Sequence, residues 1–524
     1  MTKPFRLTYS TMFAPPEELH TRFEAALESV KESLGKKHGH YINGETIEAE
    51  RYREKRSPVD QDMLLGRFGD GTPDETEMAV NAARKAWPEW RSMPYHERNK
   101  ILRKAASLIE ERVYEISAAV ALEVGKNRME ALGEVQETAD FFTVYCDDFE
   151  SNNGFDRALP DDPLEGFKST NRSIMKPHGV WAVITPFNFP FALAGGPVAA
   201  ALVTGNTVVL KGATDTPWSG VMLAQCLHDA GLPPGVFNLV NGSAHDVGQV
   251  LVEHPRVAGI TFTGSYKAGM HIYRSLAAGA YPRPCIAEMG GKNATIVTRS
   301  ADLDRAAMGI VRSAYGLSGQ KCSALSRLYV DDTVADELIK KLQAEIAKIR
   351  IGDPTERMNW LGPVANAAAY DNFASYCEQF KSDDVSLLAG GAQAREGNMA
   401  NGFYCQPTLV ELPLDHCLWQ EEMFVPILTL ARVPNRETAM ELTNAPDQGL
   451  TAGVYGSEDD VRWFLDNVEA GVTYANRPQG ATTGAWPGYQ PFGGWKGSGS
   501  TGKAIASFYY LPLYLREQSQ TIVE

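Results

Sequence analysis

A cysteine surrounded by small, polar and flexible residues is the first candidate for chemistry in this sequence. Cys322 lies in the stretch Ser318-Gly319-Gln320-Lys321-Cys322-Ser323-Ala324. A thiol attacks as its thiolate, which forms most readily in a partly exposed site near hydrogen-bond donors or positive charge. Lys321 and the backbone N–H groups beside Gly319 can supply both, so Cys322 is a candidate nucleophile. The alternative is a buried structural cysteine.

An acid in an apolar setting precedes this cysteine. Glu288 lies in Cys285-Ile286-Ala287-Glu288-Met289-Gly290-Gly291, next to two glycines. A carboxyl group held among apolar residues has a raised pKa and can act as a base toward water or a thiol. The alternative is a carboxylate that caps a turn.

An asparagine between two aromatic residues is the third candidate. Asn188 lies in Thr185-Pro186-Phe187-Asn188-Phe189-Pro190, at the end of a predicted strand. A side-chain amide in such a place can donate to an oxyanion that forms during a reaction. The alternative is a turn asparagine, which is common at strand ends.

The elements that must position these residues alternate between strand and helix. Strands alternating with helices at this spacing predict βαβ units and a doubly wound, parallel α/β sheet. The predicted strands are 180–185, 207–210, 236–240 and 259–262, and the predicted helices are 191–203, 219–229 and 244–253.

Glycine-containing turns follow two of these strands, Gly242 to Gly248 and Phe262-Thr263-Gly264-Ser265. Parallel sheets bind ligands at the carboxyl ends of their strands, where such turns lie. Neither turn contains GxGxxG, so the usual dinucleotide fingerprint is absent. Each is also compatible with an ordinary loop.

The remaining segments frame this region. Residues 1–16 resemble an arm, 17–34 and 74–129 have helical spacing of apolar residues, and 147–169 has the composition of a connection. A second alternating α/β region begins after Gly290 and extends to about Ala475. The apolar stretch Tyr509 to Leu515 predicts a terminal strand that packs across a subunit interface.

Composition excludes several classes of protein. The chain has 524 residues, of which 44% are hydrophobic and 22% charged, so we expect about two to four globular units. A net charge of -15 without clustered Lys and Arg argues against nucleic-acid binding. The seven cysteines show neither a CxxC nor any metal-ligand spacing, so we expect no metal and a reducing, cytoplasmic location. Neither a signal peptide nor a membrane span is expected.

The motifs as a set resemble the aldehyde dehydrogenase superfamily over nearly the whole chain. They occur in the order of that family: Thr-Pro-Phe-Asn188-Phe-Pro, Val-Val-Leu-Lys211, Phe262-Thr-Gly-Ser265, Glu288-Met-Gly-Gly-Lys, Gly-Gln-Lys-Cys322, Glu-Glu422-Met-Phe424-Val-Pro and Pro491-Phe-Gly-Gly494. The resemblance implies an α/β fold with a Rossmann-like NAD-binding domain, a catalytic domain and a small β oligomerisation flap. It further implies an NAD(P)-dependent aldehyde dehydrogenase that is a homo-oligomer, at least a dimer.

The resemblance also implies a mechanism. Cys322 would attack the aldehyde, the thiohemiacetal would give its hydride to NAD(P)⁺, and water activated by Glu288 would hydrolyse the thioester. Asn188 and the backbone N–H of Cys322 would form the oxyanion hole. Both chemical steps pass through an oxyanion, and losing one such donor costs roughly 10² to 10³ in rate.

The cofactor site follows from the same resemblance. Lys211 would contact the adenine ribose, Ser265 the pyrophosphate and Glu422 the nicotinamide ribose, with Phe424 nearby. Thr214 stands where a glutamate often favours NAD, so we expect NAD and keep NADP open. The expected cofactor-binding residues are Thr185, Pro186, Phe187, Lys211, Thr214, Gly242, Gly248, Phe262, Thr263, Gly264, Ser265, Glu288, Gly290, Glu422 and Phe424.

Within the superfamily, several stretches resemble the 1-pyrroline-5-carboxylate dehydrogenases, which oxidise glutamate semialdehyde to glutamate in proline catabolism. These are Leu-Glu-Val-Gly-Lys126-Asn, Val-Gln-Glu137-Thr-Ala-Asp-Phe, Gly-Gln-Lys-Cys322-Ser and the loop Gly484-Ala-Trp-Pro-Gly488. In that branch the glutamate lies near the substrate ammonium group and the serine binds its carboxylate. The expected substrate-binding residues are Glu137, Phe187, Lys321, Ser323, Gly484, Ala485, Trp486 and Phe492.

The chain departs from that branch in the same loop. Trp486-Pro487 replaces aliphatic residues, Gly480 to Thr483 lengthen the approach, and Gly212 follows the lysine where proline is common. Loops carry specificity, so these changes bear on the substrate more than on the chemistry. Trp486 can stack on a flat aldehyde, or it can pack beneath the loop.

Two other functions stay open at this point. One is a dehydrogenase for another aldehyde, aromatic or heterocyclic; the other is a non-catalytic structural relative, which the presence of all three catalytic candidates disfavours.

The expected domains are 1–40 as an arm and helix, 41–150 with 177–289 as the NAD(P)-binding domain, 290–478 as the catalytic domain, and 151–176 with 479–524 as oligomerisation and substrate-anchoring elements.

Overall fold

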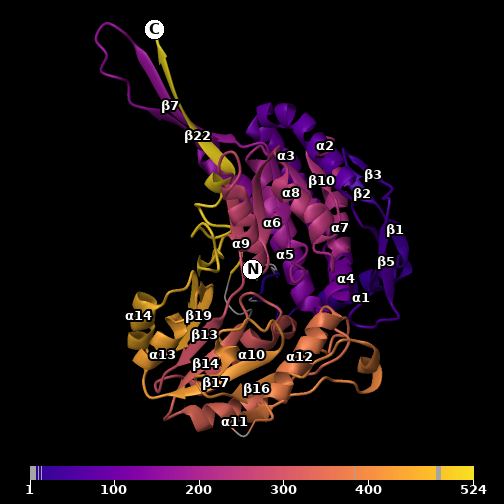
Figure 1. Cartoon of the computed structure of the whole chain (residues 1–524), viewed down its shortest axis with the longest axis vertical. Coiled ribbons are helices and arrows are strands. Elements are labelled where there is room, and N and C mark those ends of the chain that lie inside the picture. Colours follow the sequence, from indigo (N-terminus) through magenta and orange to yellow (C-terminus); the bar gives the residue numbers. More distant parts are fainter. Residues whose placement is uncertain (1–6, 10, 13–14, 383, 479–484) are drawn as a thin grey trace.

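Two seven-stranded sheets form the body of the protein. The computed structural model describes residues 7–9, 11–12, 15–382, 384–478 and 485–524. In Figure 1 the first sheet and its helices occupy the upper half, and the second sheet and its helices the lower half. The described helices are all too short or too polar to cross a membrane.

The first sheet is the predicted doubly wound sheet. Its strands from β12 to β10 run parallel, and β2 and β3 extend it antiparallel at one edge. The strand order is β12 (Cys285–Glu288), β11 (Val257–Thr263), β8 (Val180–Ile184), β9 (Thr207–Lys211), β10 (Phe237–Leu239), β2 (His40–Ile42) and β3 (Glu45–Ile47).

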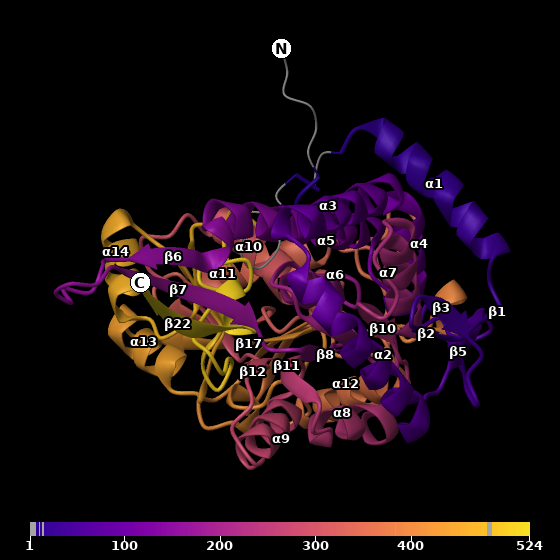
Figure 2. The same ribbon diagram turned by 90° about the horizontal axis from the view of Figure 1, so that it is seen from above.

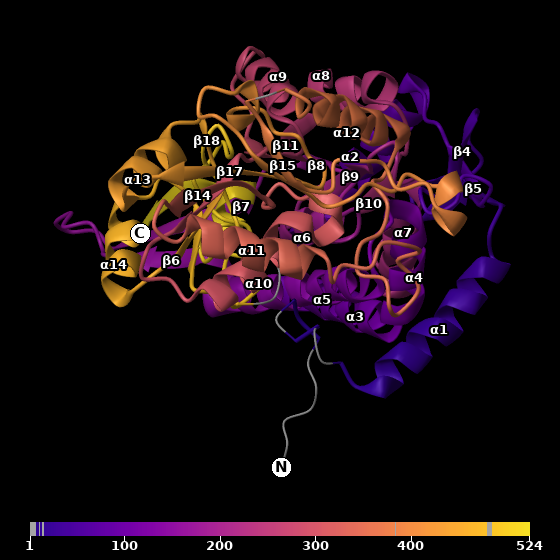
Figure 3. The ribbon, with the colours of Figure 1, turned by 90° about the horizontal axis from the view of Figure 1, so that it is seen from below.

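Helices cover both faces of this sheet, as parallel strands require. Figures 2 and 3 place α8 (Val250–Glu253) and α9 (Tyr266–Ala277) on one face and α6 (Ala192–Val203) on the other. Nearly every residue of α6 is buried because α5 (Arg128–Ser151) packs on its outer side. The other helices around this sheet are α2 (Pro73–Ser92), α3 (Tyr95–Glu111), α4 (Val113–Val124) and α7 (Pro217–Asp229).

The second sheet is parallel except for its edge strand β15. Its strand order is β15 (Ser386–Ala389), β16 (Thr408–Glu411), β17 (Ile427–Val433), β14 (Leu325–Asp331), β13 (Asn293–Val297), β19 (Thr451–Tyr455) and β20 (Val472–Ala475). The helices of this half are α10 (Leu303–Tyr315), α11 (Ala335–Ile346), α12 (Ala367–Gln379), α13 (Arg436–Asn444) and α14 (Glu458–Asn467).

Smaller sheets complete the fold. One contains β1 (Lys36–His38), β5 (Leu64–Gly69) and β4 (Tyr52–Arg56), and another pairs β18 (Gln448–Gly449) with β21 (Trp495–Lys496). Helix α1 (Glu17–Glu32) has the predicted apolar face and packs on α4.

An arm of three antiparallel strands projects from the body, with the carboxyl terminus near its tip (Figure 1). It consists of β6 (Asp156–Leu159), β7 (Ser169–Pro177) and β22 (Leu515–Val523). The predicted strand at 509–515 is wrong, because Leu511–Tyr514 forms a 3-10 turn and the strand begins at Leu515. Tyr510 and Tyr514 are both fully buried, four residues apart, so packing overrides their strand propensity.

The loop that carries Cys322 leaves α10 through a short turn, Gly316–Gly319, with three successive left-handed residues. Leu317, Ser318 and Gly319 have φ of 50°, 52° and 70°. Such a conformation costs about 1 to 3 kcal/mol for each non-glycine residue, so other contacts must hold it. Glu130 Oε2 accepts from the Leu317 N–H at 3.2 Å, and Ser318 Oγ donates to the Gly362 carbonyl at 2.7 Å.

Gly319 has no room for a side chain, since a Cβ there would lie 2.4 Å from the Val425 carbonyl oxygen. We therefore expect Gly319→Ala to destabilise the protein by about 1 to 3 kcal/mol, measured as a lower melting temperature, because a Cβ that overlaps a backbone oxygen forces the turn to shift. Gly166→Ala is the matched control, with φ of 79° and open space around its Cβ. Equal melting temperatures of the two variants would contradict this role of Gly319.

Candidate active site

Cys322 follows the left-handed turn and precedes β14, and its side chain is partly exposed. Burial of the sulfur raises the pKa of the thiol to about 12, and the nearby carboxyl groups of Glu422 and Glu288 act in the same direction. The backbone N–H groups of Ser323 and Cys322 act against this shift. The thiol therefore needs a base to take its proton before it attacks.

The backbone of Cys322 is held by Asn293 at the start of β13. Asn293 Nδ2 donates to the carbonyl oxygens of Cys322 at 2.6 Å and Ala324 at 2.8 Å, while its Oδ1 accepts from the Thr451 N–H. Asn293 thus ties the nucleophile loop to two strands of the second sheet.

Asn188 lies beside the nucleophile loop, as its predicted role requires. The residue is 2% exposed, and its Nδ2 donates to the carbonyl of Gln320 at 2.8 Å. A side-chain amide carries two N–H groups, so one is left to donate to a substrate oxygen. The buried position supplies the low dielectric in which such a donor is most effective.

Glu288 ends strand β12 of the first sheet and is 8% exposed. Burial raises its pKa well above the ordinary value, although Glu288 Oε2 accepts from the Gly494 N–H at 3.3 Å. A carboxyl group with a raised pKa is a stronger base when it ionises. The structure therefore gives Glu288 the surroundings that a general base needs.

Four acidic residues of α5, Glu130, Glu134, Glu137 and Asp140, lie at helical spacing and form what we name the acidic face of α5. Glu130 Oε1 pairs with Lys321 Nζ at 2.5 Å, next to Cys322. Because Glu130 also accepts from Leu317, it holds the nucleophile loop at both ends.

Glu134 holds the loop that carries Asn188. Its Oε1 accepts from the N–H groups of Phe191 and Ala192, at the start of α6. Its Oε2 accepts from Lys126 Nζ at 2.6 Å, and Lys126 also donates to the Asn188 carbonyl at 2.9 Å. Lys126 and Glu134 are both fully buried, so this ion pair holds the backbone of Asn188 in place.

A cavity of about 90 Å³ opens in front of Cys322. It brings together five of the predicted substrate residues, Glu137, Lys321, Ser323, Ala485 and Phe492. It also includes residues that the sequence analysis missed: Tyr9, Phe141, Phe189, Ala192, Leu193 and Ile505.

The other predicted substrate residues lie elsewhere. Trp486 does not line this cavity; it is 3% exposed, and its Nε1 donates to Asp140 Oδ2 at 2.6 Å. Phe187 contacts Phe424 edge to face, at 5.8 Å between ring centroids, on the cofactor side. Gly484 lies outside the described residues.

The predicted cofactor residues gather at one edge of the first sheet. They follow or end the parallel strands: Thr185, Pro186 and Phe187 after β8, Lys211 on β9, Gly242 after β10, Phe262, Thr263, Gly264 and Ser265 at β11, and Glu288 and Gly290 at β12. Gly248 joins them, since a Cβ there would contact the Lys211 side chain. Such an edge is where open α/β sheets bind nucleotides.

Glu422 approaches this edge from the second half of the protein. Its Oε1 accepts from the Gly291 N–H at 2.9 Å, and burial raises its pKa. A Cβ at Gly290 would lie 2.1 Å from Glu422 Oε2, so the glycine makes room for the carboxylate.

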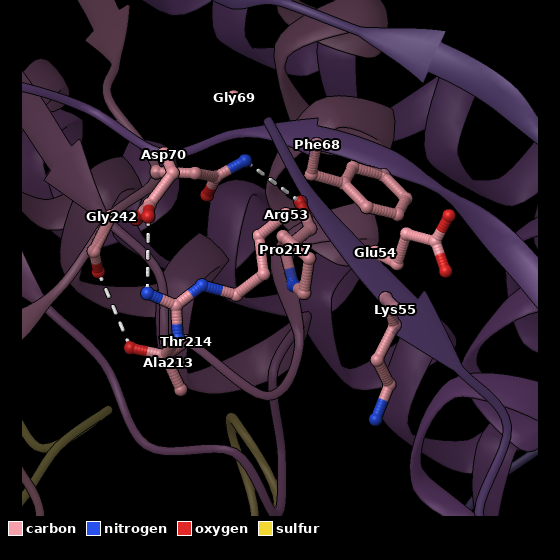
Figure 4. A pocket seen from close by; sticks show the side chains of 11 residues that line it. Arg53, Glu54, Lys55, Phe68, Gly69, Asp70, Ala213, Thr214, Pro217 and Gly242 are labelled. Atoms are coloured by element: carbon pink, nitrogen blue, oxygen red, sulfur yellow. Dashed lines mark hydrogen bonds and ion pairs between the residues drawn. The ribbon is translucent and has the colours of Figure 1, made fainter. Parts of the chain in front are cut away.

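A pocket at this edge has two of the predicted cofactor residues, Thr214 and Gly242, in its lining (Figure 4). Thr214 Oγ1 donates to the Gly242 carbonyl at 3.3 Å, and the guanidinium of Arg53 lies between Thr214 and Asp70 in the figure, 3.1 Å from the Asp70 carboxylate. Asn241 Oδ1 is buried there without a hydrogen-bond partner in the described part of the chain. An acceptor without a partner suits a hydrogen-bond donor of a bound nucleotide. The charged residues of the lining are two basic and two acidic ones, Arg53, Lys55, Glu54 and Asp70.

Tyr9, Lys126, Glu130 and Glu134 are the main residues that sequence reasoning missed. The acids of α5 could have been found in the sequence, because they recur at helical spacing and so lie on one face of the helix. Few other polar residues lie on the buried side of that helix. Tyr9 had none, because its contact with α5 is entirely tertiary. Among the described residues, no cluster of His, Cys, Asp or Glu could hold a metal ion.

Comparisons with known proteins agree with this geometry. The model of the "Aldehyde dehydrogenase family" matches residues 46–518. The curated "1-pyrroline-5-carboxylate dehydrogenase 1" of Halalkalibacterium halodurans is 38% identical, with 100% of both chains covered.

Solved structures are similar over the same length. The 1-pyrroline-5-carboxylate dehydrogenase from Thermus with bound NAD has a TM-score of 0.92 and 34% identity, with 100% of both chains covered. The "E. coli NADP dependent enzyme" has a TM-score of 0.85 and 31% identity, over 93% of this chain and 98% of that one. Fold, motifs and site geometry agree, and this chain belongs to the aldehyde dehydrogenase family.

Proposed function

We propose that this enzyme oxidises L-glutamate γ-semialdehyde, the open form of 1-pyrroline-5-carboxylate, to L-glutamate with a nicotinamide nucleotide. The observation that carries the proposal is the cavity in front of Cys322, which has Glu137 as well as Ser323 and Lys321 among its lining residues. A carboxylate and hydroxyl or cationic donors in one small cavity suit an aldehyde with an ammonium and a carboxylate group. The full-length similarity to 1-pyrroline-5-carboxylate dehydrogenases supports it.

In the first step the Cys322 sulfur forms a bond to the aldehyde carbon, and the carbonyl oxygen becomes an oxyanion. Asn188 Nδ2 and the Cys322 backbone N–H donate to that oxygen. Glu288, whose pKa is raised by burial, is the group that we assign to take the thiol proton. Fixed donors cost no reorganisation when the charge develops.

The bound nicotinamide nucleotide supplies the two-electron oxidation of the resulting thiohemiacetal to a thioester. Lys211, Ser265 and Glu422 are the residues that we assign to hold it. After it has released the thiol proton to solvent, Glu288 removes a proton from water as the water oxygen attacks the thioester carbon. The C–S bond breaks, the carboxylate product leaves, and Cys322 regains its thiol.

We also propose that the pocket in Figure 4 binds the adenosine end of the nucleotide and accepts NADP as well as NAD. Thr214 places no negative charge near a 2′-phosphate, and the Arg53 guanidinium offers it a partner. Burial lowers the pKa of Lys211 to about 8, which leaves the amine largely protonated at pH 7.

The remaining assignments are also proposals. We assign 41–150 with 177–289 to cofactor binding, 290–478 to catalysis, and 151–176 with 479–524 to assembly and substrate anchoring. A cytoplasmic location is supported by seven cysteines, all of which are free thiols in the structure.

The substrate proposal predicts a large preference for the amino acid aldehyde. We expect kcat/KM for L-glutamate γ-semialdehyde to exceed that for propanal or benzaldehyde by about a hundredfold or more, because each charge-assisted contact contributes about 1.5 to 3 kcal/mol. Cys322→Ala should retain the fold and lose turnover with every aldehyde. Faster oxidation of the neutral aldehydes by the wild type would exclude the proposed substrate.

The cofactor proposal predicts that Arg53 discriminates between the nucleotides. Arg53→Ala should lower kcat/KM for NADP by about tenfold or more, through loss of one charge-assisted contact, and change that for NAD little. Arg67→Ala is the matched control, since Arg67 lies on the neighbouring strand and pairs with Glu54. An equal loss for both nucleotides in Arg53→Ala would argue against a 2′-phosphate contact.

We propose that the β6, β7 and β22 arm joins copies of the chain into a homo-oligomer. The arm projects from the body, and Phe167, Ile522 and Val523 expose 61%, 59% and 49% of their surface. Light scattering should give a mass of at least twice 57.4 kDa for the full chain, and a smaller assembly when residues 516–524 are removed. A monomeric full-length protein would contradict the proposal.

A further inference from the structure

Among the described residues of the amino-terminal arm, Tyr9 is the one whose side chain reaches the cavity in front of Cys322. The ring lines the cavity together with Glu137, and the residue is 8% exposed. Its hydroxyl donates to Glu137 Oε2 at 2.7 Å. A residue that precedes α1 thus contacts the acid that we assign to the substrate ammonium group.

The Tyr9 ring is packed on two sides. It contacts Trp486 edge to face, at 5.0 Å between centroids, and Phe189 at 6.5 Å. Trp486 is in turn fixed by its hydrogen bond to Asp140. The Tyr9 ring is therefore held in the cavity wall by Phe189 and, from behind, by Trp486.

Helix α5 leaves a space for this ring. A Cβ at Gly133 would lie 2.7 Å from Tyr9 Cε1, so any larger residue there would push the ring away. Thr8 and Thr11 form a turn around Tyr9, with the Thr11 N–H donating to the Thr8 carbonyl at 3.0 Å. The position of Tyr9 is thus specified by both the arm and the helix.

The charge on Glu137 depends on this contact. Burial raises the pKa of Glu137 to about 8, the Tyr9 hydrogen bond lowers it, Glu134 and Asp140 raise it and Lys126 lowers it. Burial and the neighbouring Glu137, Glu134 and Glu130 raise the pKa of Tyr9 well above its ordinary value, so the phenol stays a donor. Only the ionised carboxylate attracts an ammonium group strongly.

We infer that Tyr9 is a specificity-determining residue, whose hydroxyl orients Glu137 toward the ammonium group of the substrate and favours its ionised form, and whose ring lines the cavity. The inference rests on the proposed substrate, because it assigns Glu137 to that ammonium group. It assigns to the amino-terminal arm a direct part in substrate selection.

The test compares two aldehydes that differ only in the amino group, L-glutamate γ-semialdehyde and glutarate semialdehyde. Tyr9→Phe should lower the ratio of their kcat/KM values by about tenfold at pH 7, since a hydrogen bond to a charged group is lost. The value for glutarate semialdehyde should stay within about twofold. In the variant the ratio should recover as the pH rises, because Glu137 then ionises at a higher pH.

Tyr281→Phe is the matched control, since Tyr281 is 64% exposed. An unchanged ratio in Tyr9→Phe, or an equal loss for both aldehydes, would overturn the inference. The wild-type ratio tests the proposed substrate separately: a ratio of one or below would exclude that substrate, while the shift between wild type and variant would still decide the role of Tyr9.

The ring is tested by two further variants. Tyr9→Ala and Gly133→Ala should both raise kcat/KM for benzaldehyde, the first by removing the ring and the second by displacing it. A fall or no change in both variants would overturn the part of the inference that concerns the ring.

Discussion

The burial of two lysines beside the acidic face of α5 is the constraint on which the active site depends. Lys126 is fully buried and Lys321 nearly so, and each is paired with a carboxylate of α5. Breaking such a pair by removing one partner costs about 3 to 5 kcal/mol, because an unpaired charge is left inside. The loops that carry Asn188 and Cys322 therefore cannot leave α5 without that cost, and this fixes Asn188 against the segment of Cys322.

Different parts of helix α5 hold different parts of the site. Glu130 and Glu134, in its first part, hold the loops of Cys322 and Asn188. Glu137 lines the cavity and binds Tyr9, and Asp140 holds Trp486 behind the Tyr9 ring. The cofactor edge depends on other forces, since it is built from the carboxyl ends of β8 to β12. The loops of Cys322 and Asn188, the cavity wall and the edge of the first sheet are thus held by different contacts, and all three adjoin Cys322.

Much of this arrangement could be predicted from the sequence. The strands at 180–185 and 259–262 and the helix at 191–203 follow from alternating apolar runs, and a parallel sheet brings the ends of its strands to one edge. Prediction from local sequence pattern failed where tertiary packing determines the structure. Tyr510 and Tyr514 turn inward as a 3-10 segment although their propensity favours a strand, and the contact of Tyr9 with α5 spans 128 residues that no local pattern connects.

The position of Tyr9 also bears on how substrates are inferred across this family. The region shared with the family model begins at residue 46, so a comparison confined to it contains Cys322, Glu288 and the ends of β8 to β12 but not the Tyr9 side chain. On the role inferred for Tyr9, two relatives with identical motifs would differ in what they oxidise through a segment that such a comparison leaves out. Sequence change in the first dozen residues would then alter substrate preference while the catalytic residues stay the same.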